Sequence, residues 1–535
     1  MNRNQLTSRG LVVSFIGLLI ITTSSMYVAL RMGALPWPTV FVTVISMLAL
    51  RKAKGVTMQE INVTHTLMDA GAMVAGGLAF TLPGLWILQP DAHISTVTLI
   101  AIALSGSLLG TAFTALKRRE MIETRKLPFP MGQASHDTLV AGVQGGSVAR
   151  VLFIAMAGSI VFTILRDSLG LIPAVITIFA GSALIPTLMI WVSPMGAAIG
   201  ALIGPKYSFV WVAGAVFGYF FLTPLGIMTG LFTDMAAADL FRSNLGIGFM
   251  VGTGIGIFLK AIVSRFKEIL SRDKTRARWP SVDPGTARTV SLLIVAVILL
   301  LAFFTDLSFL HIIVLLAGTY ISTSLSATLT GQTGINPMEI FGILVLLVVS
   351  AIWSPSLAIA FTVATVTTVA CGMTGDVMND LKSGSLLGTD STTQQFAQAI
   401  GSLAGAVIAV FVLLVMKDAF GNFGTAELPA PQASAVAAMA GGLGNVPAFL
   451  IGAVGGILLY IFNVPAATFG LGIYLPVYIS AIVGIGTLIM SICRKTFAHK
   501  MSDADITSTG TILSSGLLGG EGITGVVIAI ISMFG

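Results

Sequence analysis

Long apolar stretches separated by short polar segments run along almost the whole chain. About 20 consecutive apolar residues cross a bilayer as an α-helix, and by this rule the chain contains about 14–16 candidate transmembrane helices. The clearest candidates are Gly10–Leu30, Ile94–Leu116, Ala287–Phe304, Ile400–Met416 and Phe469–Ile492. Apolar and polar residues do not alternate in these runs, as they would in the strands of a membrane barrel. The pattern predicts an all-α polytopic membrane protein.

The segment Gly331–Trp353 departs from the pattern of a regular apolar helix, because Gly331, Gly334 and Pro337 interrupt it. An odd number of crossings after the central basic loop would also place the basic residues around Arg494 outside the cell, against the usual charge bias. We therefore expect at least one broken or re-entrant segment, with this one as the candidate. Non-helical backbone at membrane depth is tolerated only where it lies within protein or beside a cavity.

Composition supports the membrane assignment, since 55% of the residues are hydrophobic and only 9% are charged, against roughly 25% in soluble domains. The net charge of +6 comes from basic loops, above all residues 265–288. Such loops are typical of the cytoplasmic side, so the charge requires no nucleic-acid partner. Cys371 and Cys493 both lie in apolar runs and are expected to be packing residues.

The basic loop divides the chain into an N-terminal membrane half (residues 1–264), the cytoplasmic loop (265–288) and a C-terminal membrane half (289–535). Thr66–Gly77 and Thr511–Gly522 are weakly similar, with threonine, leucine and glycine at matching positions. Transporters often contain such repeats, although chance similarity between Gly-rich segments is a comparable explanation. The two halves are therefore candidates for a repeat, each with one acid in a Gly-rich helix.

The polar island Gly375–Gln395 lies between two apolar stretches. Charged groups in such a setting are costly and often functional. If the island is helical, Asp376 and Asp380 share one face, and neighbouring carboxylates hold one proton more tightly, which suits proton uptake. Lys382 could neutralise one of the two. A solvated cytoplasmic loop is the alternative interpretation.

A second polar group precedes it in the first half, where Glu60, Asn62, His65 and Asp69 fall along one stripe of a predicted helix. A histidine near a carboxylate can relay protons, although a hydrogen-bonded packing histidine is the commoner case. Glu60 also suits the positive end of a helix start. Glu521 stands alone in an apolar helix, where an acid is costly without water or a partner.

These patterns give two sets of candidate residues. The candidates for proton coupling are Glu60, Asp69, Asp376, Asp380 and Glu521. The candidates for substrate binding are His65, Gln332, Asn336, Asn379, Lys382, Gln394 and Gln395.

Five segments, in order along the chain, resemble the oligopeptide transporter (OPT) family, which includes the yellow-stripe-like carriers of metal chelates. They read EINVTHTLMDAGAMVAGGLAFTLP, LPFPMGQASHDTL, GDVMNDLKSGSLLGTDSTTQQFAQAIG, GLGIYLPVYI and ILSSGLLGGEGITGVV. The chain departs from the family pattern at Asn379, where glutamine is common, and at Thr392 and Thr393, where basic residues are common. It also has Glu339 in a turn that usually carries small residues. It resembles a divergent, short prokaryotic-type member.

The resemblance implies secondary active transport of oligopeptides or related small chelates across the cytoplasmic membrane, coupled to proton entry. The expected partners are a small-molecule substrate and the lipid bilayer, with a homodimer left open. No enzymatic activity, metal or cofactor is expected, apart from protons as the coupling ion. Two alternatives are a passive channel and a lipid-diphosphate transferase in which Asp376 and Asp380 hold Mg²⁺; the transferase would need a second acid cluster.

Overall fold

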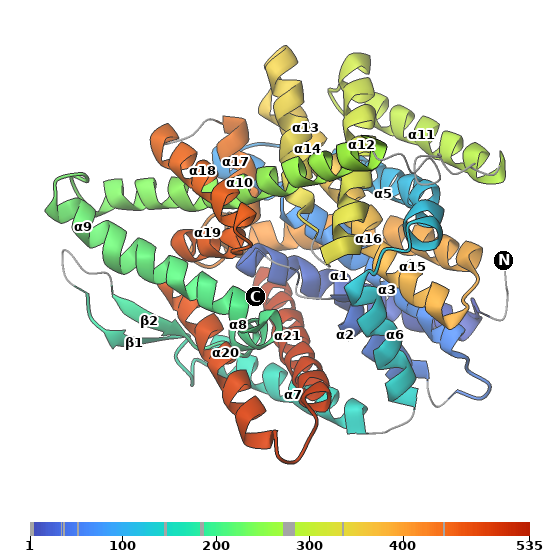
Figure 1. Cartoon of the computed structure of the whole chain (residues 1–535), viewed down its shortest axis with the longest axis horizontal. Helices are drawn as coiled ribbons and strands as arrows, with labels where there is room; N and C mark the ends of the chain where they lie inside the picture. The colour runs from blue at the N-terminus through green and yellow to red at the C-terminus, as the bar shows by residue number, and fades with distance from the viewer. Residues whose placement is uncertain are drawn as a thin grey trace. The chain divides into compact units, whose positions relative to one another are not determined.

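The chain divides into two compact, mainly helical units, and each unit is built from two separate stretches of the sequence; Figure 1 labels their helices and strands. The computed structural model describes residues 5–33, 35, 38–50, 53–143, 147–181, 187–270, 284–333, 336–441 and 445–534. Unit 1 comprises Met1–Gly146 and Ala261–Gly441, and unit 2 comprises Ser147–Lys260 and Gly442–Gly535. Much of the basic loop, residues 271–283, lies outside the described part. The division of the chain at this loop therefore stays a prediction.

The regular secondary structure in the described part of unit 1 is entirely helical. Its first segment contains α1 (Ser8–Met32), α2 (Pro38–Leu50), α3 (Met58–Ala79), α4 (Pro83–Leu88), α5 (Thr96–Arg118), the π-helical turn η1 (Arg119–Thr124) and α6 (Pro130–Val143). Its second segment contains α11 (Pro284–Phe304), α12 (Phe309–Thr333), α13 (Met338–Trp353), α14 (Leu357–Gly375), α15 (Val377–Leu387), α16 (Ser391–Phe420) and α17 (Pro431–Gly441).

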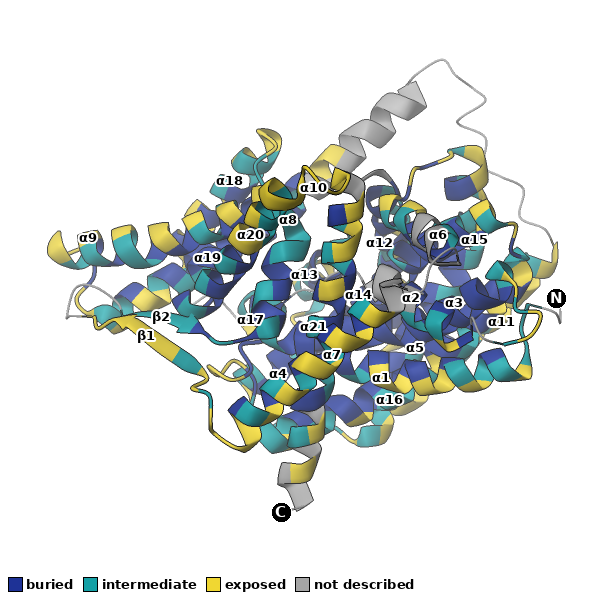
Figure 2. Ribbon diagram, turned by 90° about the horizontal axis from the view of Figure 1, so that it is seen from below, coloured by how far each residue is buried: buried dark blue, intermediate teal, exposed yellow. Residues whose placement is uncertain are grey.

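Helices α3 and α14 form the centre of unit 1 and pack against each other. Every residue from Glu60 to Ala79 in α3 is buried (Figure 2), and so is every residue from Ala360 to Gly375 in α14. A helix that is buried on all sides needs no polar face. The polar side chains of α3 therefore serve another purpose than contact with water.

Glycines bring α16 into backbone contact with α3. A Cβ on Gly401 would lie 2.1 Å from the carbonyl oxygen of Leu67, and one on Gly405 would lie 2.5 Å from the Cα of Gly71. Small residues allow this close approach between membrane helices. The contact fixes the position of the polar N-terminal turns of α16 relative to α3.

Replacing Gly401 by alanine is expected to destabilise unit 1, because the new methyl group would collide with backbone that cannot rotate away. Overpacking of this kind costs about 1–3 kcal/mol. The free energy of unfolding can be measured by SDS titration in mixed micelles. Gly158→Ala is the matched control, since a Cβ at Gly158 would have no neighbouring atom within 4 Å. An equal loss of stability in both variants would contradict the packing argument.

Unit 2 is also mainly helical. It contains α7 (Ser147–Thr163), the π-helical turn η2 (Ile164–Ser168), α8 (Pro194–Ala215), the π-helical turn η3 (Val216–Leu222), α9 (Thr223–Met228), most of α10 (Met235–Leu270), α18 (Val446–Ile461), α19 (Ala466–Tyr474), α20 (Val477–Phe497) and α21 (Asp503–Phe534). Its strands β1 (Val175–Phe179) and β2 (Leu188–Trp191) form a short antiparallel hairpin. Helix α8 packs against α19, α20 and α21, and α7 packs along α21.

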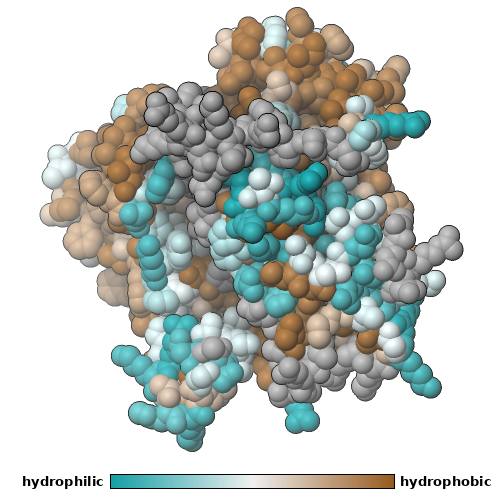
Figure 3. Space-filling model, turned by 45° about the vertical axis from the view of Figure 1, so that its right-hand side comes forward, coloured by the Kyte–Doolittle hydropathy of each residue, from teal (hydrophilic) through white to brown (hydrophobic). Residues whose placement is uncertain are grey.

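The prediction of an all-α polytopic membrane protein is confirmed. Ten helices in the described residues are long and apolar enough to cross a membrane, and α13 and α18 are shorter apolar helices. This is fewer than the 14–16 spans counted along the sequence. Broad apolar regions on the face in Figure 3 are brown, while hydrophilic side chains gather in separate teal regions.

Most of the predicted segments correspond to single helices, but one does not. The four segments that begin at residues 10, 94, 287 and 400 match α1, α5, α11 and α16. The fifth prediction, a single span over Phe469–Ile492, is wrong, because α19 ends at Tyr474 and α20 begins at Val477. Pro476 separates the two helices; proline lacks a backbone N–H and forces the preceding residue out of the helical region.

The predicted interruption in Gly331–Trp353 is confirmed, at a slightly later position. Helix α12 continues through Gly331 to Thr333, and α13 begins at Met338, directly after Pro337. Gly331 stays helical and packs closely against the loop before α6, where the N–H of Phe129 donates to its carbonyl oxygen at 2.9 Å. The break leaves Asn336 outside both helices.

Candidate functional site

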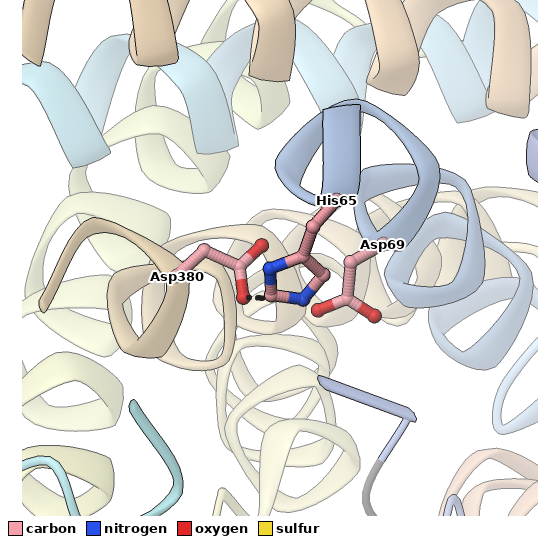
Figure 4. Close-up of side chains that lie close together, drawn as sticks. All are labelled: His65, Asp69 and Asp380. Carbon is pink, nitrogen blue, oxygen red and sulfur yellow. Dashed lines mark ion pairs between the residues drawn. The ribbon is translucent and has the colours of Figure 1, made fainter. Parts of the chain in front are cut away.

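Three titratable side chains from two helices of unit 1 meet in its interior: His65 and Asp69 of α3, and Asp380 of α15 (Figure 4). His65 Nε2 lies 3.4 Å from Asp380 Oδ1, and ligand atoms of the three residues lie within 4.8 Å of one another. The imidazole ring lies between the two carboxyl groups. All three side chains are fully buried, with 0% exposure. We call this set the His-Asp-Asp cluster.

Each helix places its members for a local reason. His65 and Asp69 are four residues apart, so they project from the same face of α3. Helix α15 begins right after α14 and ends at Leu387, and the φ of 71° at the following Gly388 allows the chain to turn into α16. A left-handed residue is least costly as glycine. This short helix brings Asp380 to the face of α3 that carries the histidine.

A pair of hydroxyl groups from two further helices extends from the histidine. The Thr43 hydroxyl of α2 lies 3.4 Å from His65 Nε2 and 2.6 Å from the Ser135 hydroxyl of α6. Helices α2 and α6 pack against each other, and α2 also packs against α3. The Thr43 hydroxyl, which can both donate and accept, therefore links the imidazole to Ser135 of α6.

Gln394 connects α16 to both helices of the cluster. Its amide nitrogen donates to the Thr66 hydroxyl of α3 at 2.9 Å and to the carbonyl oxygen of Asp380 at 2.7 Å. Asp390 caps the start of α16 by accepting from the N–H of Thr393 at 2.9 Å. An N-cap carboxylate satisfies a backbone donor that has no helical partner. The cap and the glutamine hold α15 in place against α3.

The cluster combines charges that cannot all be ionised in a dry interior. Two carboxylates and one imidazole lie close together, and neither carboxylate oxygen of Asp380 accepts a hydrogen bond within the described residues. Burying an unpaired charge is very costly, and two adjacent carboxylates favour sharing a proton. The arrangement can therefore bind and release protons. It is also the one set of three His, Cys, Asp or Glu side chains in the described residues close enough to share a metal ion.

Asp376 belongs to a different polar group from Asp380. Its carboxylate accepts from the amide nitrogen of Asn336 at 2.8 Å. The Ser326 hydroxyl of α12 donates to the side-chain amide oxygen of the same asparagine at 2.8 Å. The broken segment between α12 and α13 therefore meets the junction of α14 and α15. Although Asp376 and Asp380 are four residues apart, their side chains contact different partners.

Glu60 lies near the start of α3, before His65, and contacts α1. Arg9 makes a two-pronged ion pair with it, with Nε–Oε1 and Nη2–Oε2 distances both of 2.7 Å. The Thr7 hydroxyl donates to Oε1 at 2.6 Å. Glu60 also occupies the first turn of α3, which is capped by Thr57. The glutamate is thus fixed by an arginine, and it does not join the His-Asp-Asp cluster.

The remaining predicted substrate-binding residues occupy varied positions. Asn379 is buried and accepts from the N–H of Gly132 in α6 at 3.2 Å. Lys382 is half-buried and makes no ion pair with any described residue. Gln395 bonds back to the carbonyl of Ser391 in its own helix at 3.1 Å. The Gln332 side chain lies outside the described part of the chain.

Glu521 lies in unit 2, and it is not alone as the sequence suggested. Arg166 Nη1 lies 2.9 Å from its Oε1. The Ser193 hydroxyl donates to it at 2.9 Å and the N–H of Met195 at 2.8 Å. Asp167 also binds the arginine, at 2.6 Å. Glu521 of α21 is therefore fully paired. Its carboxylate lies at the N-terminal end of α8, where the helix dipole favours negative charge.

Five polar residues in or near these clusters were not among the candidates chosen from the sequence. They are Arg9, Thr43, Ser135, Arg166 and Gln398. Arg166 and Arg9 carried a usable signal, because an arginine inside or beside an apolar run requires an acidic partner. Gln398 is fully buried one turn after Gln394, and its amide atoms have no hydrogen-bond partner among the described residues. Threonine and serine give no such signal, since they are common in membrane helices.

Comparison with known proteins decides the family. The sequence model described as "OPT oligopeptide transporter protein" matches residues 5–277 and 285–532. The chain belongs to the oligopeptide transporter family. It is also 25% identical to the "Putative oligopeptide transporter" of Haemophilus influenzae, over an alignment of 598 positions that covers 95% of this chain and 92% of the relative.

Membership of the OPT family confirms the resemblance drawn from the five sequence segments. The protein is a transporter and a multi-pass protein of the cell membrane, with a small-molecule substrate. The alternative of a lipid-diphosphate transferase is wrong, because OPT proteins are transporters and not enzymes. A homodimer, the coupling ion and the absence of a bound metal stay predictions.

Proposed function

We propose that this OPT protein imports oligopeptides or related small chelates together with protons, and that the His-Asp-Asp cluster takes up the proton. One observation carries the proposal: His65, Asp69 and Asp380 form a fully buried group from two different helices. Intramembrane acids and histidines of this kind are typical of proton pathways. Among the predicted proton-coupling residues, Glu60 and Glu521 are each already paired with an arginine, unlike the members of the cluster.

The proton site is next to groups that suit a peptide. Lys382 follows Asp380 by two residues on α15 and is available to a substrate carboxylate. Asp376 directly precedes the same helix and accepts a hydrogen bond from Asn336 of the α12–α13 break; the two side chains can bind an amine and a peptide carbonyl. A helix that carries both the proton acceptor and substrate contacts can shift when either is occupied. Such differential contacts are the requirement for coupling two ligands.

Uptake into proteoliposomes under an imposed pH gradient tests the proposal. A gradient of two pH units supplies about 2.7 kcal/mol per proton, since each unit is worth about 1.36 kcal/mol. One coupled proton then allows about a hundredfold accumulation of substrate. Labelled di- to pentapeptides and metal chelates are compared in parallel, and a protonophore serves as the control. Uptake that only equilibrates would favour a passive channel, and accumulation that ignores the gradient would contradict proton coupling.

A further inference from the structure

A polar pocket lies in unit 1, where the first turns of α5 and α14 meet the end of α11. Its volume is about 410 Å³, which falls in the range of roughly 300–1,000 Å³ typical of ligand sites. Thr98 and Thr362 contribute hydroxyl groups to its lining, and His93 and Asp306 contribute ionisable groups. Among the described residues that line it, none is a lysine or an arginine. The pocket is therefore rich in hydrogen-bond acceptors.

The pocket lies at the membrane side opposite the basic loops. Helix α5 runs from the pocket to Lys117 and Arg118 in its last turn, and α11 runs to the pocket from the basic loop at residues 265–288. Both helices are long and apolar enough to cross the membrane. Since basic loops are typical of the cytoplasmic side, the pocket lies on the extracytoplasmic side, where an imported substrate arrives.

The polar side chains of the pocket suit an ammonium group. Asp306 is exposed and forms no ion pair with any residue in the described ranges. The Thr362 hydroxyl donates to the carbonyl oxygen of Ala358 in its own helix at 2.7 Å, and the Thr305 hydroxyl donates to that of Leu301. Because these hydroxyl protons are already used, the oxygens offer lone pairs to a ligand. An ammonium group brings three N–H donors and no acceptor.

The helix ends around the pocket add a place for a negative group. The ends of a helix carry about half a unit charge each, positive at the N-terminus and negative at the C-terminus. Residues from the N-terminal turns of α5 and α14 and from the C-terminal turn of α11 line the pocket together. These partial charges and the Asp306 carboxylate nearly balance. A ligand with one positive and one negative group therefore fits better than a simple cation, since helix N-termini bind carboxylates.

We propose that this pocket captures a zwitterionic short peptide before transport, with the peptide amino group at Asp306 and its carboxylate at the first turns of α5 and α14. The inference rests on the proposed import of peptides and adds an outer binding site to it. Neither Asp376 nor any member of the His-Asp-Asp cluster lines the pocket. A metal chelate whose amines all bind the metal would gain nothing from Asp306, so the outer site favours peptides over such chelates.

Protection of an introduced cysteine tests the outer site directly. Val97 lines the pocket and is 56% exposed, so Val97→Cys should react with a membrane-impermeant thiol reagent added outside right-side-out vesicles. The parent protein gives the background from Cys371 and Cys493. We expect trialanine to slow modification of Val97→Cys several-fold. N-acetyl-trialanine amide, which lacks both end charges, should protect much less.

Phe309→Cys is the matched control for protection. Phe309 begins α12 and is 65% exposed, but it does not line the pocket. Its modification should be unaffected by trialanine.

Removing the acid of the pocket tests the assignment of the peptide amino group. Asp306→Asn, added to Val97→Cys, should raise the trialanine concentration that gives half protection by about two- to fivefold, as expected for a partly exposed ion pair. Asp91→Asn is the matched control, because Asp91 is an exposed acid of the preceding loop that does not line the pocket. It should leave the half-protective concentration unchanged.

Three results would overturn the outer site: equal protection by the two probes, an unchanged half-protective concentration in Asp306→Asn, or modification of Val97→Cys only in inside-out vesicles. Loss of protection in Asp376→Asn alone would also do so, because the peptide would then bind at the inner site. Protection is measured without a pH gradient. A protected pocket in a protein that never accumulates peptide would contradict the proposed function and support the outer site, whereas accumulation without protection would contradict the outer site alone.

Discussion

Replacing Asp380 by asparagine is expected to abolish gradient-driven accumulation while leaving the protein folded. The amide has the size of the acid but cannot take up or release a proton. A pH gradient of two units should then give an internal substrate level about equal to the external one, instead of the roughly hundredfold excess that one proton allows. Exchange of labelled for unlabelled substrate at equal pH should persist, because asparagine resembles the protonated aspartate.

Asp390→Asn is the matched control for this variant. It makes the same chemical change in the same polar segment, but Asp390 caps α16, and asparagine is an equally good N-cap residue. This variant should accumulate substrate like the wild type. If Asp380→Asn also does so, the His-Asp-Asp cluster is not the proton site. If both lose accumulation together with exchange, the segment has a structural role in transport that is independent of protons.

The sequence predicted the parts of the structure that depend on local pattern. Long apolar runs gave α1, α5, α11 and α16 directly, because a helix must satisfy its backbone within the membrane. The i, i+4 spacing of His65 and Asp69 placed both on one face of α3. The pattern failed at Phe469–Ile492, where a single proline inside a continuous apolar run ended one helix and began another.

The site was predictable as a set of residues but not as a set of contacts. Asp380 meets His65, whereas Asp376 meets Asn336, although spacing suggested that the two aspartates act together. Which helix face meets which neighbour is decided by close glycine contacts, such as Gly401 against Leu67, between segments far apart in the chain. One sequence contains no direct signal for such pairings. Arg166 signalled that it needs an acidic partner, but its pairing with Glu521 was hidden for the same reason.

Removing Arg166 is expected to destabilise the protein by about 3–5 kcal/mol, the typical cost of leaving a buried charge without its partner. The Arg166 and Glu521 side chains are 1% and 0% exposed, so water cannot replace the missing guanidinium. Arg166→Met keeps much of the apolar volume, which separates the loss of charge from the loss of packing. The free energy of unfolding can be measured by SDS titration in mixed micelles.

A double variant shows whether the ion pair or the individual residues matter. Arg166→Met with Glu521→Gln removes both charges and should lose less stability than the sum of the single variants, as expected for residues in direct contact. Glu123→Gln is the control, because its pair with Arg118 is half exposed and such pairs contribute about 0–1 kcal/mol.

If Glu521→Gln alone keeps its stability but loses gradient-driven accumulation, Glu521 carries the proton and the assignment to the His-Asp-Asp cluster is wrong. If Glu521→Gln unfolds more easily while keeping accumulation, the buried pair holds η2, α8 and α21 together, and Glu521 does not carry the coupled proton.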